Sequence, residues 1–181
     1  MSKTYTILQD DREKKPLLFP TALRILDPSQ PPLKRRAATV GLVVEKGRYL
    51  TGDYLLKGHE HRMIVERKGH LDEVAGNCLT VSGRRKFVAE CERLREACQR
   101  PVLLLEGTPR ELAARRSYSK IDPDLARDAL QRLCLEYGIE MVLLPNVGTS
   151  NRREVGKWIA ALLVNSALTG PPKHASTLHP S

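Results

Sequence analysis

Residues 51–73 read TGDYLLKGHEHRMIVERKGHLDE and combine a Gly-Asp turn, an apolar strand pattern and several acids beside two bases. The apolar run at 61–67 predicts a strand that ends near Glu66 and Lys68. Side chains two residues apart on a strand face the same side, so Glu66 and Lys68 are expected to project together. Asp53 ends the preceding strand and can meet Glu66 if the two strands are adjacent.

The acids of this stretch are suited to a hard divalent cation. Mg²⁺ and Mn²⁺ prefer oxygen ligands, and two or three carboxylates supply them. A lysine such as Lys68 beside the ion can orient or deprotonate a metal-activated water and offset charge on a phosphate. The spacing resembles the D-x(n)-E-x-K pattern of PD-(D/E)XK nucleases. The alternative interpretation is a solvated, charged edge of the domain.

The charge of the whole chain favours a polyanionic partner. The formal net charge is +9 and the isoelectric point is about 9.6, and nucleic acid is the commonest partner of such proteins. A membrane surface is the other candidate, but no basic amphipathic helix with a Trp/Phe face stands out. The apolar runs fall well short of the roughly 20 residues of a membrane span, and the N-terminus lacks a signal-peptide core. We therefore expect an intracellular protein.

The remaining chain predicts strands followed by alternating strands and helices. Expected strands cover 4–9, 61–67, 100–107 and 139–145, and 39–56 is interpreted as a β-hairpin that turns near Lys46-Gly47. Expected helices cover 72–98 with a break near TVSGRR, 108–116, 122–138 and 149–168. This order predicts one three-layer α/β domain over 1–169, a mixed sheet flanked by helices, followed by a disordered tail at 170–181.

The apolar stripes of these helices predict what lies in the core. In the long helix Phe87, Cys91, Leu94 and Cys98 form the buried side, and Glu90 and Arg93 lie on the other side. All four cysteines are expected to be reduced and buried. Leu125, Ala129, Leu130 and Leu133 form the expected stripe of the helix at 122–138. Trp158, Ile159, Leu162 and Leu163 suit the core or, in part, a dimer interface.

Several motifs together resemble the nuclease domain of the XPF-type structure-specific endonucleases. Gly52-Asp53 and the run from Glu66 through Lys68 to Asp72 match the hallmark GD…ERKxxxD. The DDRE element at 10–13 resembles a D-x-R-E element of that family, and GRR at 83–85, VLLLEG at 102–107 and the final helix follow in the family's order. The resemblance covers residues 4–168 and implies a restriction-endonuclease-like, PD-(D/E)XK-type fold.

The resemblance also implies roles for matching residues. Asp53, Glu66 and Asp72 would hold Mg²⁺ or Mn²⁺, Lys68 would act on the attacking water, and Arg67 would position a loop or a phosphate. Asp10, Arg12 and Glu13 would line the same cleft. Three of the five histidines, His59, His61 and His70, are near the site and are interpreted as ordinary loop residues, because oxygen ligands already account for the site. The alternative for His70, which lies inside ERKxxxD, is a phosphate contact.

The function implied is a metal-dependent DNA endonuclease that hydrolyses phosphodiester bonds at branched or single/double-strand junctions and acts as a homodimer or heterodimer. Neither the tandem helix-hairpin-helix domain nor the helicase of familiar members is recognisable, so a stand-alone nuclease domain is expected. The alternative is a catalytically silent DNA-binding or scaffold subunit. Silent partners typically lose the acids or the lysine, and this sequence keeps them all.

Two basic segments are candidate DNA contacts. Arg84, Arg85 and Lys86 lie at the start of a helix, where cations are disfavoured unless a phosphate is near. The segment RRSYSK offers Arg115, Arg116 and Lys120 between two helices. A solvated face and an ordinary loop are the alternative interpretations.

Overall fold

Seven strands form one mixed sheet in the computed structural model, which describes residues 3–27, 30, 36–69, 71–113, 122–145 and 151–169. The sheet order is β2-β3-β1-β4-β5-β6-β7. The strands are β1 (Thr4–Asp10), β2 (Ala22–Leu26), β3 (Ala37–Gly47), β4 (Tyr54–Leu56), β5 (Met63–Lys68), β6 (Arg100–Glu106) and β7 (Glu140–Leu144).

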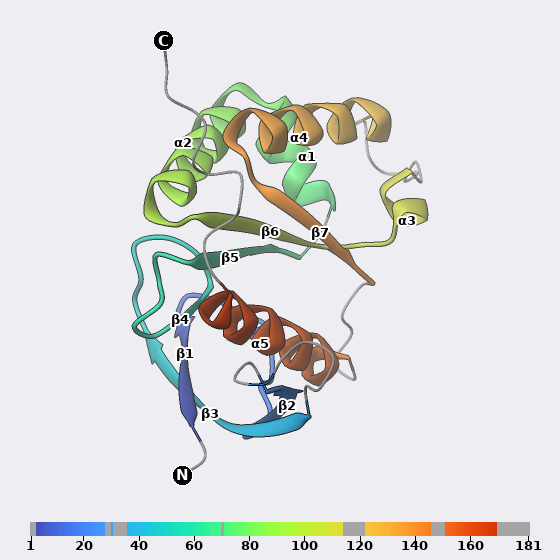
Figure 1. The fold of residues 1–181 in the computed structure, drawn as a ribbon. Helices are drawn as coiled ribbons and strands as arrows, with labels where there is room; N and C mark the ends of the chain where they lie inside the picture. Colours follow the sequence, from blue (N-terminus) through green and yellow to red (C-terminus); the bar gives the residue numbers. More distant parts are fainter. Residues whose placement is uncertain are drawn as a thin grey trace.

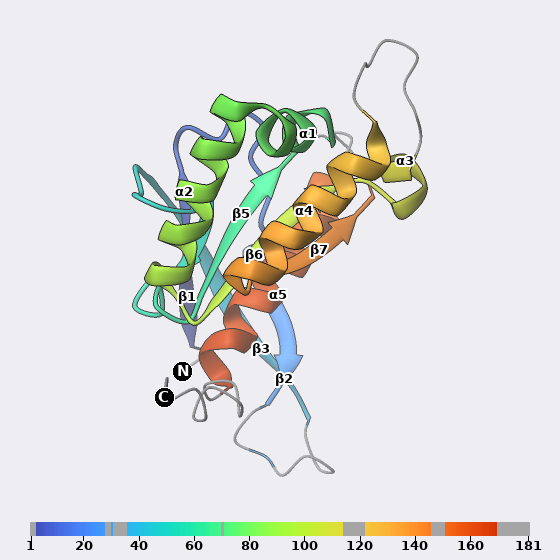
Figure 2. The same cartoon turned by 90° about the horizontal axis from the view of Figure 1, so that it is seen from above.

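Helices cover both faces of this sheet, as Figure 1 shows. They are α1 (Leu71–Leu79), α2 (Val81–Ala97), α3 (Pro109–Ala113), α4 (Pro123–Tyr137) and α5 (Arg152–Leu168). Helices α1, α2 and α4 pack on one face through one apolar cluster, and α5 packs on the other face through a second cluster. Figure 2 shows α2 and α4 on either side of β5, with α1 where β5 ends. The predicted three-layer fold is confirmed.

The pairing of strands brings the motif residues to the middle of the sheet. Strand β4 lies between β1 and β5 and is antiparallel to both, whereas β5, β6 and β7 are parallel. In the register of β4 and β5, Tyr54 is opposite Val65. The prediction that Asp53 ends a strand is wrong, since Asp53 directly precedes β4. Because β4 is the neighbour of β5, Asp53 still lies beside the strand that carries Glu66.

The predicted hairpin at 39–56 is wrong. Strand β3 pairs with β2 and with β1, and β1 separates it from β4. The physical reason is that β1, with Ile7 wholly buried, needs a strand on each side, and β3 and β4 supply them. Strand β2, which the sequence analysis did not anticipate, alternates buried Leu23 and Ile25 with exposed neighbours and occupies the edge.

Two helix predictions are settled by the packing. The break before α2 is confirmed, because Thr80 caps α2 and its hydroxyl oxygen accepts a hydrogen bond from Gly83 N at 3.1 Å. The stripe of α4 is wrong in one residue, since Leu125 is 60% exposed and Ala126 is buried in its place. The buried residues Ala126, Leu130 and Leu133 follow the helical period, and the buried stripe begins one residue later than predicted, at Ala126.

The predicted core positions on α2 and α5 are confirmed for most residues. Ile159 and Leu163 are wholly buried against the sheet, whereas Trp158 is half-exposed. The four cysteines are free and buried, and burial raises the pKa of each thiol, to about 12 for Cys91 and to about 11 for the other three. Unreactive, reduced thiols are the expected consequence.

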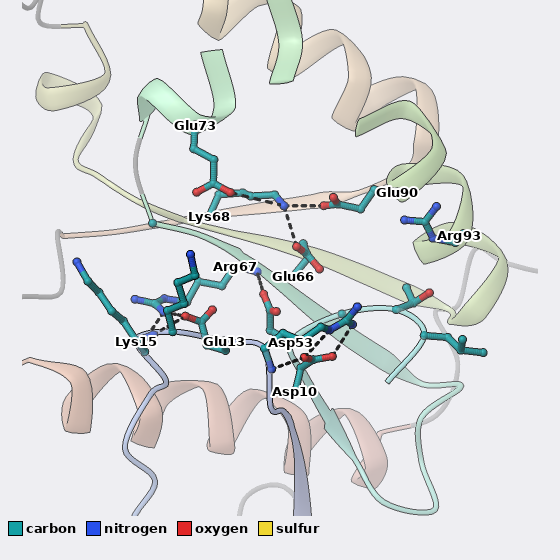
Figure 3. Close-up of a pocket in the computed structure, with 16 residues that line it drawn as sticks. Asp10, Glu13, Lys15, Asp53, Glu66, Arg67, Lys68, Glu73, Glu90 and Arg93 are labelled. Carbon is teal, nitrogen blue, oxygen red and sulfur yellow. Dashed lines mark hydrogen bonds and ion pairs between the residues drawn. The ribbon is translucent and has the colours of Figure 1, made fainter. Parts of the chain in front are cut away.

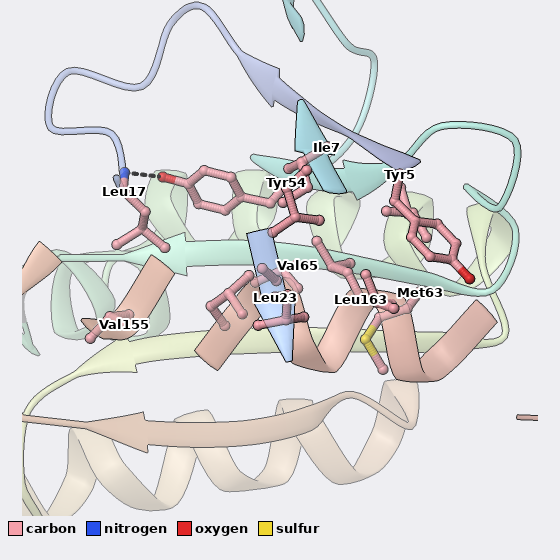
Figure 4. Packing of buried hydrophobic residues seen from close by; sticks show 14 of the residues in the cluster. Tyr5, Ile7, Leu17, Leu23, Tyr54, Met63, Val65, Val155 and Leu163 are labelled. Carbon is pink, nitrogen blue, oxygen red and sulfur yellow. Dashed lines mark hydrogen bonds between the residues drawn. The ribbon is translucent and has the colours of Figure 1, made fainter. Parts of the chain in front are cut away.

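Tyr54, the residue after Asp53, anchors this part of the sheet in the core (Figure 4). Its side chain is wholly buried, and its hydroxyl oxygen accepts a hydrogen bond from Leu17 N at 3.0 Å. Its ring meets the ring of Phe19 edge-on, with centroids 5.4 Å apart. The segment that follows β1 is thereby attached to β4, which brings residues 10–15 close to Asp53.

No helix in the described ranges is long and apolar enough to cross a membrane. The segment at 170–181, predicted to be a disordered tail, lies outside the described residues. So do Arg115, Arg116 and Lys120.

Candidate active site

Charged side chains from five parts of the chain line a cleft of about 610 Å³ at the ends of β1 and β5 (Figure 3). The segment after β1, the loop before β4, the end of β5 and the helices α1 and α2 all contribute to its wall. The charged residues that line it are Asp10, Arg12, Glu13, Lys14, Lys15, Asp53, Glu66, Arg67, Lys68, Glu73, Glu90 and Arg93.

Asp53 is placed by a turn that only glycine fits. Gly52 has φ of 79°, and a Cβ at this position would lie 2.1 Å from Cγ2 of Ile64. Asp53 N donates a hydrogen bond to Val65 O at 2.9 Å, which joins the turn to β5. The carboxylate then accepts a hydrogen bond from Arg67 N at 2.7 Å. The Gly-Asp pair therefore aims one carboxylate at the edge of β5.

Glu66 and Lys68 project together into the cleft, as their spacing on β5 predicted. Lys68 Nζ donates a hydrogen bond to Glu66 Oε1 at 2.8 Å. Both side chains are largely buried, with 13% of Glu66 and 7% of Lys68 exposed. A buried ion pair has strong directional preferences, so this contact fixes the position of both groups.

The carboxylates of Asp53 and Glu66 repel one another. Burial raises the pKa of Asp53, and burial and then the charge of Asp53 raise the pKa of Glu66. Burial alone would lower the pKa of Lys68, but the charges of Glu66 and Glu90 outweigh it and raise that pKa. Within the described ranges no lysine or arginine lies within ion-pair distance of Asp53. Lys68 is paired with Glu66, so it is Asp53 whose charge no neighbouring cation in the described ranges offsets by direct contact.

The donor set fits a hard divalent cation. Asp53 offers carboxylate oxygens from the turn before β4 and Glu66 from the neighbouring strand β5, and an added cation would relieve their mutual repulsion. No cluster of three or more potential metal ligands occurs among the described side chains. Asp72 lies in the first turn of α1, but its side chain is not among those described. Its predicted part in metal binding stays a prediction.

Arg67 turns away from Glu66 and Lys68, because neighbouring residues on a strand face opposite sides. Its guanidinium donates to the Glu106 carboxylate and to Lys15 O, the latter at 2.7 Å, and lies 3.2 Å from a Glu13 oxygen. With 5% of the Arg67 side chain exposed, these contacts connect β5, β6 and the segment after β1. The resemblance implied that Arg67 positions either a loop or a phosphate. This geometry agrees with the first role, because Arg67 contacts the segment after β1.

Asp10 and Arg12 form a second ion pair at the edge of the cleft. Arg12 donates to both oxygens of Asp10, through Nε at 2.8 Å and Nη2 at 2.6 Å. These side-chain hydrogen bonds lower the pKa of Asp10 to about 2. Arg12 also donates to Tyr49 O at 2.7 Å. The pair therefore holds the loop between β3 and β4, which leads to Asp53.

Comparison with known proteins identifies the family. The sequence profile of the ERCC4 domain matches residues 24–162. The chain belongs to the ERCC4 domain family. The resemblance to XPF-type endonucleases is thereby confirmed, and no curated protein sequence matches the chain.

Two solved structures share the fold of this ERCC4 domain. "XPF from Aeropyrum pernix" has a TM-score of 0.56 and 23% identity over 97% of this chain and 67% of that chain. "XPF from Aeropyrum pernix, complex with DNA" has a TM-score of 0.56 and 21% identity over 90% of this chain and 65% of that chain. This chain spans about two thirds of the length of these chains, and the expected restriction-endonuclease-like fold is confirmed.

The ERCC4 domain also brings residues to the cleft that sequence reasoning missed. Glu73 of α1 and Glu90 of α2 both face Lys68, and Lys14, Lys15 and Arg93 line the same wall. The stripe of α2 placed Glu90 on the side away from the core, but its side chain is only 22% exposed. Glu90 follows buried Phe87 by three residues, so it borders the apolar stripe, and that position was the available signal.

The predicted DNA contacts in the first turns of α2 lie on different faces of the helix. Arg84, Arg85 and Lys86 are all exposed. Lys86 precedes Glu90 by four residues and Arg93 by seven, which places all three on one helix face toward the cleft. Arg84 and Arg85 lie on other faces of α2, around a separate shallow hollow.

Proposed function

We propose that this ERCC4 domain is a divalent-metal-dependent endonuclease that hydrolyses phosphodiester bonds of DNA, at branches or at junctions of single and double strands. The observation that carries the proposal is the meeting of Asp53, Glu66 and Lys68 in one charged cleft. Family membership supports nuclease chemistry, and the net charge of +9 suits a polyanionic substrate. An intracellular location, where DNA is found, follows from this activity.

Asp53 and Glu66, with Asp72, would hold Mg²⁺ or Mn²⁺ through carboxylate oxygens. The bound ion would supply a nucleophilic water at neutral pH and offset charge on the scissile phosphate. The protein's part is to hold these oxygens in place. The turn at Gly52 fixes Asp53, and Lys68 fixes Glu66 through the contact at 2.8 Å.

Lys68 would contact the scissile phosphate as a fixed positive charge. Its ammonium lies in the wall of the cleft and is held by carboxylates on more than one element. A preorganised cation beside a phosphate stabilises charge that develops in the transition state. The same ammonium can orient the attacking water, which is the role that the resemblance implies.

The DNA backbone would follow the cations on both sides of the cleft. Lys14 and Lys15 line one wall and Arg93 lines the other, on the helix face that also carries Lys86. Arg84 and Arg85, on other faces of α2, would contact phosphates away from the cleft, and Arg115, Arg116 and Lys120 stay predicted contacts. Phosphate contacts of this kind give affinity without reading sequence.

The competing candidate is a catalytically silent DNA-binding or scaffold subunit, paired with a second copy or with a different chain. The test is cleavage of labelled duplex, flap, fork and four-way-junction DNA with Mg²⁺ or Mn²⁺, by the wild type, Asp53→Asn and Lys68→Ala. Cutting by the wild type alone supports the endonuclease. Binding without cutting by all three chains supports the scaffold instead. Light scattering on the same samples reports whether the chain is a dimer.

A further inference from the structure

Glu90 of α2 meets Lys68 from a different element than Glu66 does. Its Oε1 lies 2.9 Å from Lys68 Nζ, and this oxygen is buried. Within the described part of the chain no hydrogen-bond donor is aligned on it, so the ion pair with Lys68 is what offsets its charge. Figure 3 shows Lys68 Nζ between Glu66 and Glu90, with Glu73 on a third side at 4.0 Å.

The contact joins α2 to the end of β5. Phe87, one turn before Glu90, is buried in the core that α2 shares with the sheet, and its ring centroid lies 5.9 Å from Lys68 Nζ. The helix is thereby fixed relative to β5 by packing, and Glu90 has a fixed distance to the lysine. A lysine side chain is long and flexible, so holding its ammonium in one place costs rotamer entropy that a second carboxylate helps to offset.

We propose that Glu90 is a positioning residue for the proposed nuclease reaction. Together with Glu66 it holds the Lys68 ammonium at the cleft wall before substrate arrives. With Glu66 as its only partner, the Lys68 ammonium could still swing about that single hydrogen bond. A second carboxylate from a different element, Glu90, fixes the position of the ammonium. The effect on cleavage rests on the proposed function, but the restraint on Lys68 is a property of the free protein.

The restraint is tested without DNA or metal by NMR of ¹⁵N-labelled lysine ammonium groups. A paired, buried ammonium exchanges its protons slowly, so Lys68 is expected to give a resolved signal, which Lys68→Ala assigns by its loss. Glu90→Gln keeps the shape of the side chain and removes the charge, and the signal is expected to broaden or disappear. Glu92→Gln, an exposed change on the same helix, is the matched control and keeps the signal.

Cleavage kinetics test the consequence. Misplacing a reacting group by roughly 1 Å can cost about 100-fold in rate. Glu90→Gln is therefore expected to lower kcat at least about tenfold with KM within about twofold, while Glu90→Asp recovers part of the loss and Glu92→Gln cuts as the wild type does. Thermal unfolding of each variant checks that it is folded.

Two results would overturn the positioning role. One is a Glu90→Gln variant that keeps the Lys68 signal, and the other is a folded Glu90→Gln variant that cuts at the wild-type rate. A wild-type chain that cuts none of the substrates counts against the proposed function alone. In that case the ammonium signal by itself decides whether Glu90 restrains Lys68.

Discussion

Arg67 and Glu106 form a buried ion pair between the neighbouring strands β5 and β6, with 5% and 3% of their side chains exposed. Arg67 stands between the two residues of β5 that face the cleft, yet its guanidinium lies on the opposite side of the strand. There it also holds Lys15 O and lies beside Glu13. The arginine of the ERK run is therefore a structural link between the sheet and the segment that bears Lys14 and Lys15.

Removing Arg67 is expected to destabilise the fold strongly. Arg67→Ala removes the buried ion pair with Glu106, and breaking a buried pair of this kind costs about 3–5 kcal/mol. The double variant Arg67→Ala/Glu106→Gln removes the buried negative charge as well and should recover part of the loss. Urea unfolding followed by circular dichroism measures both. Equal loss in the single and double variants would contradict a stabilising pair and indicate that the packing of Arg67 matters most.

Asp10 should make stability depend on acid pH. Hydrogen bonds from Arg12 lower its folded-state pKa from 3.8 to about 2, so its stabilisation is complete above about pH 4 and is lost as pH falls through 2. Because Arg12 is more than half exposed, we expect about 1–2 kcal/mol at neutral pH. Asp10→Asn should be less stable by this amount at pH 7 and should approach the wild type near pH 2.

The control for Asp10 is Asp11→Asn, since half of the Asp11 side chain is exposed and its ion pair with Arg48 is long, at 3.9 Å. Urea unfolding between pH 2 and pH 7 should give nearly the same curve for this variant as for the wild type. A constant difference between Asp10→Asn and the wild type at every pH would exclude the carboxylate as the cause.

Two helical glycines should respond to alanine with opposite signs. A Cβ at Gly156 of α5 would lie 2.2 Å from Leu18 O, so Gly156→Ala must push α5 away from the segment after β1. We expect a loss of about 1–3 kcal/mol, as in other overpacked sites. Gly76 of α1 has open space around its Cβ position, and Gly76→Ala should stabilise by about 0.5–1 kcal/mol. Thermal unfolding of both variants tests the close approach of α5.

The cations of the cleft wall should carry DNA binding. Arg93→Ala and Lys15→Ala are each expected to weaken binding to all DNA structures and to reduce the salt slope of log K by about 1. Arg95→Ala, an exposed change on the same helix outside the cleft, is the control. Fluorescence anisotropy at several salt concentrations gives both numbers. An equal loss of DNA affinity in Arg95→Ala would indicate that the net charge of the protein attracts DNA, without specific phosphate contacts in the cleft.

Local signals in the sequence predicted much of the fold correctly. The capping box at the start of α3 forms as expected, with Thr108 N donating to Glu111 at 2.6 Å. Asp122 likewise caps α4 through Asp124 N at 2.9 Å. These contacts span three residues or fewer, so nearby sequence is enough to predict them. The same holds for Glu66 and Lys68, whose common side follows from the strand period.

Strand partners were less predictable, because hydrogen-bonding groups of the backbone are the same in every strand. The alternation in β3 identifies a strand, but nothing in it favours β4 over β1 as its neighbour. Burial of β1 decided the pairing and made the expected hairpin wrong. The buried face of a helix is similarly uncertain by one residue in a sequence-based prediction. In α4, Ala126 is buried where Leu125 was expected.

The sequence by itself determined the identity of the acid–lysine set, since Asp53, Glu66 and Lys68 are fixed by a turn and by one strand. Only the tertiary structure decided what surrounds Lys68. Glu90 lies on α2, beyond a helix break, and its approach to 2.9 Å depends on how α2 packs through Phe87 on the sheet. The period of a helix or strand predicts which way its side chains face. The distances between side chains of different elements are set by the packing of the whole core.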